Sequence, residues 1–465
     1  MKGIIIAGTH SGAGKTTIAV GLMALLQKRG MTVQPFKVGP DYIDPSYHRL
    51  VCGRPSYNLD TWMMGIDAVK STFTRAMQGA DIGIIEGVMG LFDGKDGRDE
   101  QGSTAHIAKI LKLPVILIVD ARSMARSAGA LVYGYERFDP GVKIAGVIFN
   151  RVGSVRHYKM LKDAVEAKCK ARALGYIPRD EEIILPERHL GLEMADEAVD
   201  GDQWTVIRKR LVKLSERFIN IDEILKLSSQ YRIQKLTLSL TTDHSPPTTR
   251  IAVARDNAFC FYYQENLDIF KQLGAELVSF SPLKDKRLPG NINGIYLGGG
   301  YPELYAKRLE TNKPMRKAIK DFAERGMPVY AECGGLMYLG KGLKNFKGEK
   351  YEMVGVFPWI SRMLEKRKSL GYREVKAVDE CPFLKKGQKI RGHEYHYSEI
   401  DEPSKKIKRC FTCNPPIPPL EKGGKGGFEG YLYKNTLTSY VHLHFASNPK
   451  FAEGFVRACS LCPPY

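Results

Sequence analysis

The first half of the sequence alternates short apolar runs with stretches in which apolar residues recur at helical spacing. After the first run, Ile18, Leu22, Leu25 and Leu26 recur in this way and predict a helix. The regular alternation of strands and helices predicts a parallel sheet that helices cover on both faces. The predicted strands are residues 2–7, 32–37, 82–86, 115–120 and 144–149, with a further strand at 175–178.

The sequence changes character between about residues 226 and 250, where serine, threonine, proline and other polar residues gather. Such a stretch is typical of a linker. Beyond it, a second series of apolar runs predicts the strands of another α/β domain, at 251–254, 276–280, 294–297 and 328–331. We therefore expect a first domain over 1–226, a linker over 227–249, a second domain over 250–455 and a C-terminal tail over 456–465.

One segment inside the second predicted domain, residues 414–430, is rich in proline and glycine. It contains too few apolar residues to form an element of the core. We expect a flexible surface insertion that takes no part in the chemistry.

Composition narrows the class of protein. Hydrophobic residues make up 43% and charged residues 26% of the 465, an ordinary globular balance. The formal net charge of +19 suggests nucleic acid or an anionic membrane, but lysine and arginine are spread along the chain without interleaved aromatic residues. The nine cysteines form no dense framework, and no secretory signal or membrane-spanning run is found. We expect a soluble, cytoplasmic protein with no nucleic-acid or membrane partner.

A glycine-rich segment follows the first predicted strand and precedes the first helix. In a phosphate-binding loop of this kind, backbone N–H groups and the helix N-terminus face the phosphates of a nucleotide. The usual pattern has glycine five positions before Gly14, where this chain has Thr9. The remaining pattern still predicts ATP binding, with Lys15 on the outer phosphates and Thr16 on Mg²⁺. The expected ATP-binding residues are Thr9, Ser11, Gly12, Ala13, Gly14, Lys15, Thr16 and Thr17.

Acidic residues follow two of the predicted strands. Glu86 ends the apolar run 82–86, and Asp41 and Asp44 come shortly after the run 32–37. Ligands lie at the carboxyl ends of strands in doubly wound sheets, and Mg²⁺ prefers carboxylate and phosphate oxygens. We expect Thr16, Asp44 and Glu86 to hold Mg²⁺. The alternative is that these acids cap helices or stabilise turns.

A cysteine stands where a predicted strand meets a glycine pair, in Ala331-Glu332-Cys333-Gly334-Gly335. Class I glutaminases expose a nucleophilic cysteine on such a strand-to-helix turn, and small residues after it let the turn close. Backbone N–H groups of Gly299, Gly300 and Gly334 are candidates for an oxyanion hole. The alternative for Cys333 is a small buried core residue.

A thiol alone is only slightly ionised at neutral pH, so a catalytic Cys333 needs a histidine as base. Residues 440–445 supply two, His442 and His444. On a strand the two would share a face. We favour His442 as the base and keep His444 as the alternative.

Taken together, these motifs closely resemble the cobyrinic acid a,c-diamide synthases, which join a dethiobiotin-synthetase-like ATP domain to a cobalamin-type glutamine amidotransferase domain. The resemblance covers nearly the whole chain. It rests on residues 7–17, 33–47, 86–94, 298–303, 331–336, 392–398 and 440–449.

The resemblance implies a fold and an activity. The fold is α/β, with a P-loop domain of doubly wound, mostly parallel sheet followed by a class I glutamine amidotransferase-like domain. The activity is ATP- and Mg²⁺-dependent amidation of the a and c acetates of cobyrinic acid through acyl phosphates, with L-glutamine as nitrogen donor. Asp41, Tyr42 and Ile43 match the family's substrate-contacting stretch. Other class I enzymes carry an acid shortly after the histidine, where this chain has His444.

Two alternatives stay open at this point. A nickel-sirohydrochlorin a,c-diamide synthase would be similar in both halves and would act on a different tetrapyrrole. A ParA/MinD-like ATPase that binds DNA or a membrane would fit the positive charge, but that class has a lysine in the loop where this chain has His10, and it needs no catalytic cysteine. The sequence leaves the assembly open, with a homodimer as one option.

Overall fold

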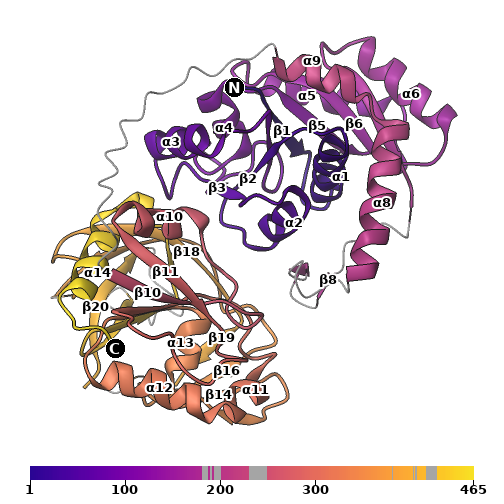
Figure 1. Ribbon diagram of the computed structural model, residues 1–465. Helices are drawn as coiled ribbons and strands as arrows, with labels where there is room; N and C mark the ends of the chain where they lie inside the picture. The colour runs from indigo at the N-terminus through magenta and orange to yellow at the C-terminus, as the bar shows by residue number, and fades with distance from the viewer. Residues whose placement is uncertain are drawn as a thin grey trace. The chain divides into compact units, whose positions relative to one another are not determined.

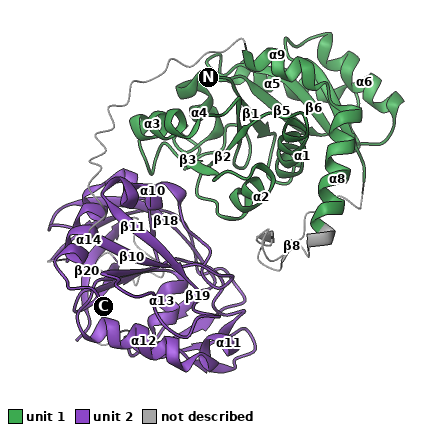
Figure 2. Cartoon of the chain, in the orientation of Figure 1, with its two compact units in different colours: residues 1–239 green, residues 240–465 purple. Residues whose placement is uncertain are grey.

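The computed structural model describes the chain except residues 181–186, 189–190, 193–200, 230–248, 380, 402, 404–405 and 415–426. The chain forms two compact units, Met1–Ser239 and Leu240–Tyr465 (Figure 2). Both are α/β, which confirms the predicted fold class. Of the predicted linker 227–249, residues 227–229 end a helix and residue 249 begins a strand, and the rest lies outside the described residues.

The first unit is built on one seven-stranded sheet in which every neighbouring pair is parallel, in the order β3-β2-β4-β1-β5-β6-β7 (Figure 1). Strands buried on both faces require continuous apolar runs, which is why these segments lack an alternating pattern. The strands are β1 (Gly3–Gly8), β2 (Val33–Val38), β3 (Tyr57–Leu59), β4 (Ile82–Glu86), β5 (Val115–Asp120), β6 (Ile144–Val152) and β7 (Arg172–Pro178). A separate hairpin pairs β8 (Glu187–Arg188) with β9 (Gly191–Leu192).

Helices cover the two faces of this sheet. The apolar residues of α1, α2, α8 and α9 pack together on one face. Right-handed crossovers place α3 to α6 on the other face. The helices are α1 (Lys15–Lys28), α2 (Ile43–Cys52), α3 (Ile66–Ala76), α4 (Thr104–Leu111), α5 (Ser127–Phe138), α6 (Val155–Glu166), α8 (Gly201–Phe218) and α9 (Ile221–Ser229). The parallel strands end at one edge, so the loops after β1, β2 and β4 meet there.

The second unit contains a ten-stranded sheet with a parallel and an antiparallel part. Five strands are parallel, in the order β11-β10-β12-β13-β22, and the sheet continues antiparallel through β21-β20-β17-β18-β23. The parallel strands are β10 (Thr249–Ala254), β11 (Ala275–Phe280), β12 (Gly294–Leu297), β13 (Val329–Glu332) and β22 (Thr436–Ser439). The antiparallel strands are β17 (Ser369–Ala377), β18 (Lys389–His396), β20 (Lys408–Asn414), β21 (Phe428–Tyr433) and β23 (His442–Leu443).

A smaller four-stranded sheet and several helices complete the second unit. The sheet consists of β15 (Lys350–Glu352), β14 (Gly342–Lys344), β16 (Ile360–Met363) and β19 (Ser398–Ile400). The helices are α10 (Gln264–Gln272), α11 (Ala306–Thr311), α12 (Lys313–Glu324), α13 (Gly334–Leu339), the 3₁₀ turn η1 (Phe445–Ser447) and α14 (Lys450–Ser460). Among the described residues, no helix is both long and apolar enough to cross a lipid bilayer.

The structure differs from the expected boundaries at two places. The predicted tail, 456–465, contains the last turns of α14, where Cys459 is buried, and Tyr465 N–H donates to Ile292 O at 2.8 Å. Of the predicted insertion 414–430, residue 414 ends β20 and residues 428–430 belong to β21, while 415–426 lie outside the described residues. Strand pairing in the insertion and packing and a hydrogen bond in the tail join these residues to distant parts of the chain, which local composition does not reveal.

The pairing of β18 with β23 leaves no room for a side chain at Gly392. Its partner in the register is Leu443, and a Cβ atom on Gly392 would lie 2.0 Å from the carbonyl oxygen of His442. We expect Gly392→Ala to destabilise the second unit by about 1–3 kcal/mol, since backbone atoms cannot move aside cheaply. Calorimetry should show a lower unfolding temperature. The control is Gly290→Ala, because a Cβ atom there meets nothing within 4 Å. Equal melting of both variants would contradict this prediction.

Candidate active sites

The loop between β1 and α1 has the backbone of a phosphate cradle. Gly12 and Gly14 adopt φ angles of 79° and 99°, which favour glycine. The Asn150 side chain donates to Ala13 O at 2.9 Å and lies so close that a Cβ on Gly14 would be 2.0 Å from its Nδ2. Arg151 Nη1 donates to Gly12 O at 3.0 Å. Asn150 and Arg151 thus hold the turn Gly12–Gly14 directly before α1.

Lys15 lies across the mouth of this loop. Its Nζ donates to Met89 O at 2.6 Å and to His10 O at 3.2 Å. Burial and repulsion from Lys37 lower the pKa of Lys15 to about 8. The ammonium group is therefore bound to backbone carbonyls and has no carboxylate at hydrogen-bond distance in these contacts. An ammonium group in this condition can form a strong charge-assisted hydrogen bond to a phosphate oxygen.

Thr16 and Glu86, two of the residues predicted to hold Mg²⁺, lie in contact. Thr16 Oγ1, in the first turn of α1, donates to Glu86 Oε1 at 2.7 Å, and Glu86 ends β4. Glu86 is fully buried, and His48 Nε2 lies 2.7 Å from its other oxygen. The carboxylate thus joins the phosphate loop to α2 through two side chains.

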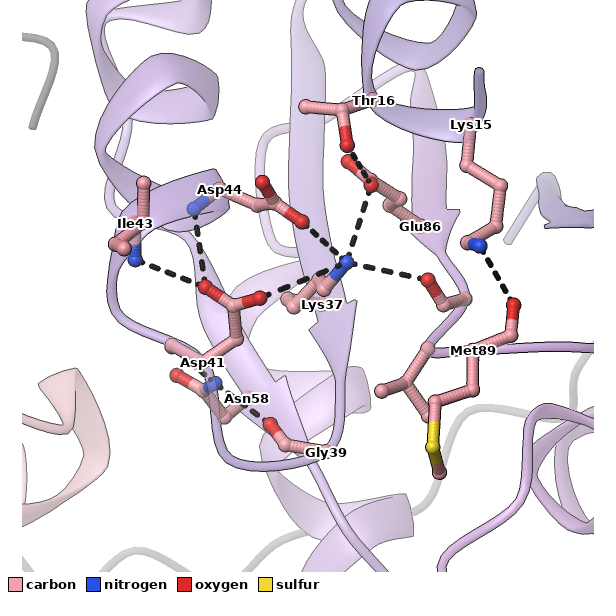
Figure 3. A network of polar contacts seen from close by, with 12 residues as sticks. Lys15, Thr16, Lys37, Gly39, Asp41, Ile43, Asp44, Asn58, Glu86 and Met89 are labelled. Carbon is pink, nitrogen blue, oxygen red and sulfur yellow. Dashed lines mark hydrogen bonds and ion pairs between the residues drawn. The ribbon is translucent and has the colours of Figure 1, made fainter. Parts of the chain in front are cut away.

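The Lys37 ammonium group stands at the centre of the site (Figure 3). It lies on β2, whose residues are all buried, and its Nζ is 2.5 Å from Asp44 Oδ2 and 3.0 Å from Glu86 Oε1. Asp41 Oδ2 is 3.8 Å away. One buried cation therefore faces three acids, which lie in α2, at the end of β4 and in the loop between β2 and α2.

These charges shift one another's protonation. Burial opposes the charged form of Lys37, but Asp44 and Glu86 outweigh it and raise its pKa. Burial would raise the pKa of Glu86, but Lys37 and the hydrogen bond from His48 outweigh it and lower that pKa. Burial and the neighbouring charges of Asp41 and Glu86 raise the pKa of Asp44. The pKa shifts of the two buried acids thus run in opposite directions.

The predicted substrate-contacting stretch forms the rim of this cluster. Asp41 Oδ1 accepts hydrogen bonds from the N–H groups of Ile43 at 2.8 Å and Asp44 at 3.0 Å, so it stabilises the start of α2. Asn58 Nδ2 donates to Asp41 O at 2.7 Å. Tyr42 directly precedes α2. Asp41 therefore has the turn-stabilising role that the sequence left as an alternative, and its Oδ2 still faces Lys37.

The donor set fits Mg²⁺ in part. Mg²⁺ usually takes one or two protein oxygens and completes its shell with substrate phosphates and water. Thr16 Oγ1 and Glu86 Oε1 are adjacent and face the phosphate loop, as this requires. Lys37 Nζ lies 2.5 Å from Asp44 Oδ2 and 3.0 Å from the same Glu86 Oε1, so it stands between the two carboxylates. Within the described residues no group of three or more His, Cys, Asp or Glu forms a metal cluster.

In the second unit, Cys333 stands on a strained turn between β13 and α13. Its φ of 46° and ψ of −100° are unusual for a residue with a side chain. The N–H of Cys333 donates to Ser439 O at 2.8 Å, which ties the turn to β22. This is the geometry of a nucleophile elbow, and no cysteine of the described chain forms a disulfide.

The three glycines predicted for an oxyanion hole lie together beside this turn. A Cβ on Gly334 would be 3.1 Å from Gly300 N and 3.4 Å from Gly299 C. A Cβ on Gly299 would be 2.4 Å from Cε1 of His442. The glycine loop after β12 therefore contacts both the cysteine turn and the candidate base.

Of the two candidate histidines, His442 faces the glycine loop. Its ring stacks on that of His393, with centroids 4.9 Å apart and planes 16° apart. The His444 ring packs against Tyr263 at 4.6 Å, and among the described residues neither of its ring nitrogens has a hydrogen-bond partner. The contact with Gly299 favours His442 as the base.

The thiol and the imidazole are both neutral in this state. Burial raises the pKa of Cys333 far above its usual value; Glu303 and Glu394 add to this effect, and the Gly334 N–H opposes it. Burial lowers the pKa of His442 to about 3, with His396 adding to it and Glu394 opposing it. A thiolate therefore has to form by proton transfer within the site.

The stretch 392–398, to which the sequence assigned no chemistry, forms a buried ion network. Glu394 accepts from Arg373 Nε at 2.8 Å and lies 2.7 Å from His396 Nε2. The His396 ring stacks on Tyr440 at 4.0 Å. This network supports the segment before His442. Sequence reasoning also missed Lys37 and His48, although a lysine inside an apolar strand is a usable signal.

Comparison with known proteins covers both units. The sequence model of the CobQ/CobB/MinD/ParA nucleotide binding domain matches residues 4–192. That of the CobB/CobQ-like glutamine amidotransferase domain matches residues 250–450. A solved structure of a glutamine amidotransferase aligns to 45% of this chain and 98% of its own, at 14% identity and a TM-score of 0.33.

Curated relatives match nearly the whole chain. A cobyrinate a,c-diamide synthase of Dehalococcoides mccartyi (strain ATCC BAA-2266 / KCTC 15142 / 195) is 44% identical over 98% of this chain and 97% of its own. The enzyme of that name from Caldanaerobacter subterraneus is 44% identical over 98% of each chain. That of Archaeoglobus fulgidus is 43% identical over 98% of this chain and 96% of its own.

Removal of the central cation should destabilise the first unit. Lys37→Met leaves Asp44 and Glu86 buried without their shared partner, and we expect a loss of about 3–5 kcal/mol in the free energy of unfolding. The double variant Lys37→Met/Asp44→Asn removes one of the uncompensated charges and should recover part of the loss. Calorimetry measures both. A single variant as stable as the original chain would show that the ion cluster does not hold this edge of the sheet together.

Proposed function

The chain belongs to the cobyrinate a,c-diamide synthase family, and from this premise we propose that it amidates the a and c acetate carboxylates of cobyrinate. ATP supplies the energy, glutamine supplies the nitrogen, and the reaction belongs to cobalamin biosynthesis. One observation carries the proposal: a single chain holds a phosphate loop with Lys15 beside Glu86 and a cysteine on a nucleophile elbow. The substrates are small molecules.

The first unit activates the carboxylate. A carboxylate is a poor acyl donor, so its oxygen takes the γ-phosphoryl group of ATP and releases ADP. Ammonia then attacks the acyl carbon, the bond to the phosphorylated oxygen breaks, and phosphate leaves with the amide formed. Catalysis of phosphoryl transfer is mainly positioning and charge stabilisation. Lys15 and the N–H groups of the loop supply the positive charge.

Thr16 and Glu86 are the side chains that would hold Mg²⁺. The ion, when bound, offsets the negative charge on the phosphates. Asp41, Tyr42 and Ile43 at the rim are proposed to contact the tetrapyrrole acid. Lys37 compensates Asp44 and Glu86, and this compensation lets a second anion, the substrate carboxylate, approach the edge of the sheet.

The second unit releases ammonia from glutamine. The Cys333 sulfur attacks the side-chain amide carbon after its proton passes to His442. The proton then goes to the departing nitrogen, which leaves as ammonia, and water hydrolyses the remaining thioester to glutamate. The N–H groups of Gly299, Gly300 and Gly334 are proposed to donate to the developing oxyanion, and the proximity of these three glycines supports this. If the chain were a ParA/MinD-like ATPase, the second unit would have no role in its function.

Mass spectrometry of the product tests the proposal. The purified chain is incubated with ATP, Mg²⁺ and glutamine, and with either cobyrinic acid or nickel sirohydrochlorin. We expect cobyrinic acid to gain two amide nitrogens in place of two hydroxyl oxygens. Diamidation of nickel sirohydrochlorin alone would transfer the assignment to that tetrapyrrole, and amidation of neither would refute the proposal.

Replacement of the nucleophile should separate the two half-reactions. We expect Cys333→Ser to lose glutamine-dependent amidation by at least about 100-fold, because the hydroxyl is a much weaker nucleophile at this site. Amidation with added ammonium chloride should persist, since the first unit is unchanged. Cys169→Ser, a cysteine in the first unit, is the matched control. Loss of both nitrogen sources in a folded Cys333→Ser protein would refute the division of labour.

Replacement of the loop lysine should stop both nitrogen sources together. We expect Lys15→Ala to lower amidation from glutamine and from ammonium alike by at least about 100-fold, because each route needs the acyl phosphate. Lys28→Ala, on the exposed end of the same helix, should leave both rates unchanged. Ammonium-driven amidation at the original rate by Lys15→Ala would exclude the proposed role of Lys15.

A further inference from the structure

Glu332 precedes the nucleophile and faces away from it. It ends β13 with its side chain buried, and its exposed fraction is 1%. Successive strand residues point to opposite faces of a sheet. The two neighbours of Glu332, Ala331 and Cys333, accordingly belong to the same apolar cluster. Tyr330, two residues earlier, lies in the cluster on the other side of the sheet. The carboxylate of Glu332 thus enters the site from the face opposite to the sulfur.

Three hydrogen bonds fix the position of this carboxylate. The hydroxyl of Tyr330 donates to Oε1 at 2.5 Å, and that of Tyr296 donates to Oε2 at 3.0 Å. The N–H of Leu443 donates to Oε1 at 2.9 Å. Leu443 follows His442 directly in β23, so the last bond anchors the backbone beside the candidate base.

The same carboxylate faces one edge of the His442 ring. Its Oε2 lies 3.9 Å from His442 Nδ1, and both side chains are almost fully buried. The Cε1 corner of the ring points at Gly299, and His393 stacks on its face. The remaining nitrogen, Nε2, is therefore directed away from Glu332. The 3.9 Å separation is an ion-pair distance and not a hydrogen bond, so Glu332 and His442 are placed to attract each other once the imidazole is protonated.

We propose that Glu332 is the positioning residue of the glutaminase site, which holds His442 by its Nδ1 edge and stabilises the imidazolium when Cys333 gives up its proton. The inference deepens the proposed function and rests on it. It also fills the gap left by the sequence, because the acid expected after the histidine is replaced by His444 and the acid used here precedes the cysteine.

The charge of Glu332 is what distinguishes this role from simple packing. In the resting state the thiol and imidazole are neutral, and the step that starts catalysis moves a proton from Cys333 Sγ to His442 Nε2. That step creates a buried cation. Glu332 is the acid that faces its Nδ1 edge. Burial raises the pKa of Glu332 to about 7, and the three hydrogen bonds oppose this shift.

Other titratable groups surround the pair and belong to the account of its pH dependence. Tyr296 on β12 and Tyr330 on β13 face Glu332. From β18, His393 stacks on His442, and His396 and Glu394 act on its charge. Cys333 itself lies at the end of β13. A change in the pH profile is therefore assigned to Glu332 only by comparison of variants that leave these groups in place.

The test compares Glu332→Gln with Glu429→Gln in the full-length chain. Glu429 is a matched control: it is buried, burial likewise raises its pKa to about 7, and it accepts from Tyr440 N and Ser439 Oγ. We expect Glu332→Gln to lower the glutaminase kcat by about 100-fold or more, with the KM for glutamine and the ammonium-driven rate within about threefold of the original. Glu429→Gln should stay within about threefold in all three.

A second readout follows the thiol directly and needs no tetrapyrrole. The rate at which iodoacetamide alkylates Cys333 is measured against pH, with the modified peptide identified by mass. Glu332 acts on the thiol in two opposite ways: its charge raises the pKa of Cys333, and it stabilises the imidazolium partner of the thiolate. The proposal requires the second effect to dominate, so loss of Glu332 should move the inflection upward by about one pH unit or more, and a downward shift would show charge repulsion alone. An unshifted inflection together with an unchanged kcat in Glu332→Gln would overturn the inference.

Three further outcomes are decisive. If Glu332→Gln does not fold, Glu332→Asp is used in its place, because the shorter side chain keeps the charge but moves it away from His442 Nδ1. We expect this variant to have an intermediate kcat. The original kcat in Glu332→Asp would overturn the inference. If the unmodified chain releases no glutamate, the proposed function fails, and the alkylation profile still decides whether Glu332 controls the Cys333–His442 pair. Equal kcat losses in Glu332→Gln and Glu429→Gln would show a structural role and also overturn it.

Discussion

The Lys37 ammonium group is the contact on which the candidate site of the first unit depends. It is buried inside β2, and it stays charged there only because Asp44 and Glu86 compensate it. Glu86 also holds Thr16 at the start of α1 and His48 on α2. One cation therefore fixes the mutual positions of the phosphate loop, the end of β4 and the start of α2. The same compensation leaves Lys15 as the poorly neutralised cation that faces incoming phosphates.

The second site differs from the first because its buried titratable groups are neutral and not ion-paired. Cys333 and His442 are both neutral in the resting structure, because burial opposes the ionised form of each. No ion pair has to be maintained before glutamine arrives, but a pair has to be created for the first bond to form. The cost of that step is set by the groups already in place, which are the N–H of Gly334 on the sulfur side and Glu332 on the imidazole side.

The sequence predicted the features that depend on local pattern, namely the apolar strands and the turns next to them. The strands that carry the sites, β4 and β12 among them, lie where continuous apolar runs place them, and Gly14 and Cys333 occupy the expected turns. It did not predict β3 or the antiparallel half of the second sheet, because short and half-exposed strands are defined by their partners. Lys37 and Glu332 were missed for a related reason. Each is a single charged residue in an apolar run, and only the tertiary structure shows which charged or polar side chains of other elements lie next to it.

Strand geometry explains how an acid next to a nucleophile can serve the same histidine. A strand sends adjacent side chains to opposite faces, so Glu332 and Cys333 cannot meet across their own strand. His442 lies in β23, a strand of two residues, and the Glu332 carboxylate bonds to the N–H of Leu443 beside it. The imidazole lies against the glycine loop with its Nδ1 edge toward Glu332. A ring in that position has the carboxylate on one edge and the glycine loop at its Cε1 corner. The acid of the site therefore need not follow the histidine in sequence; it has only to occupy the strand face that the nucleophile does not use.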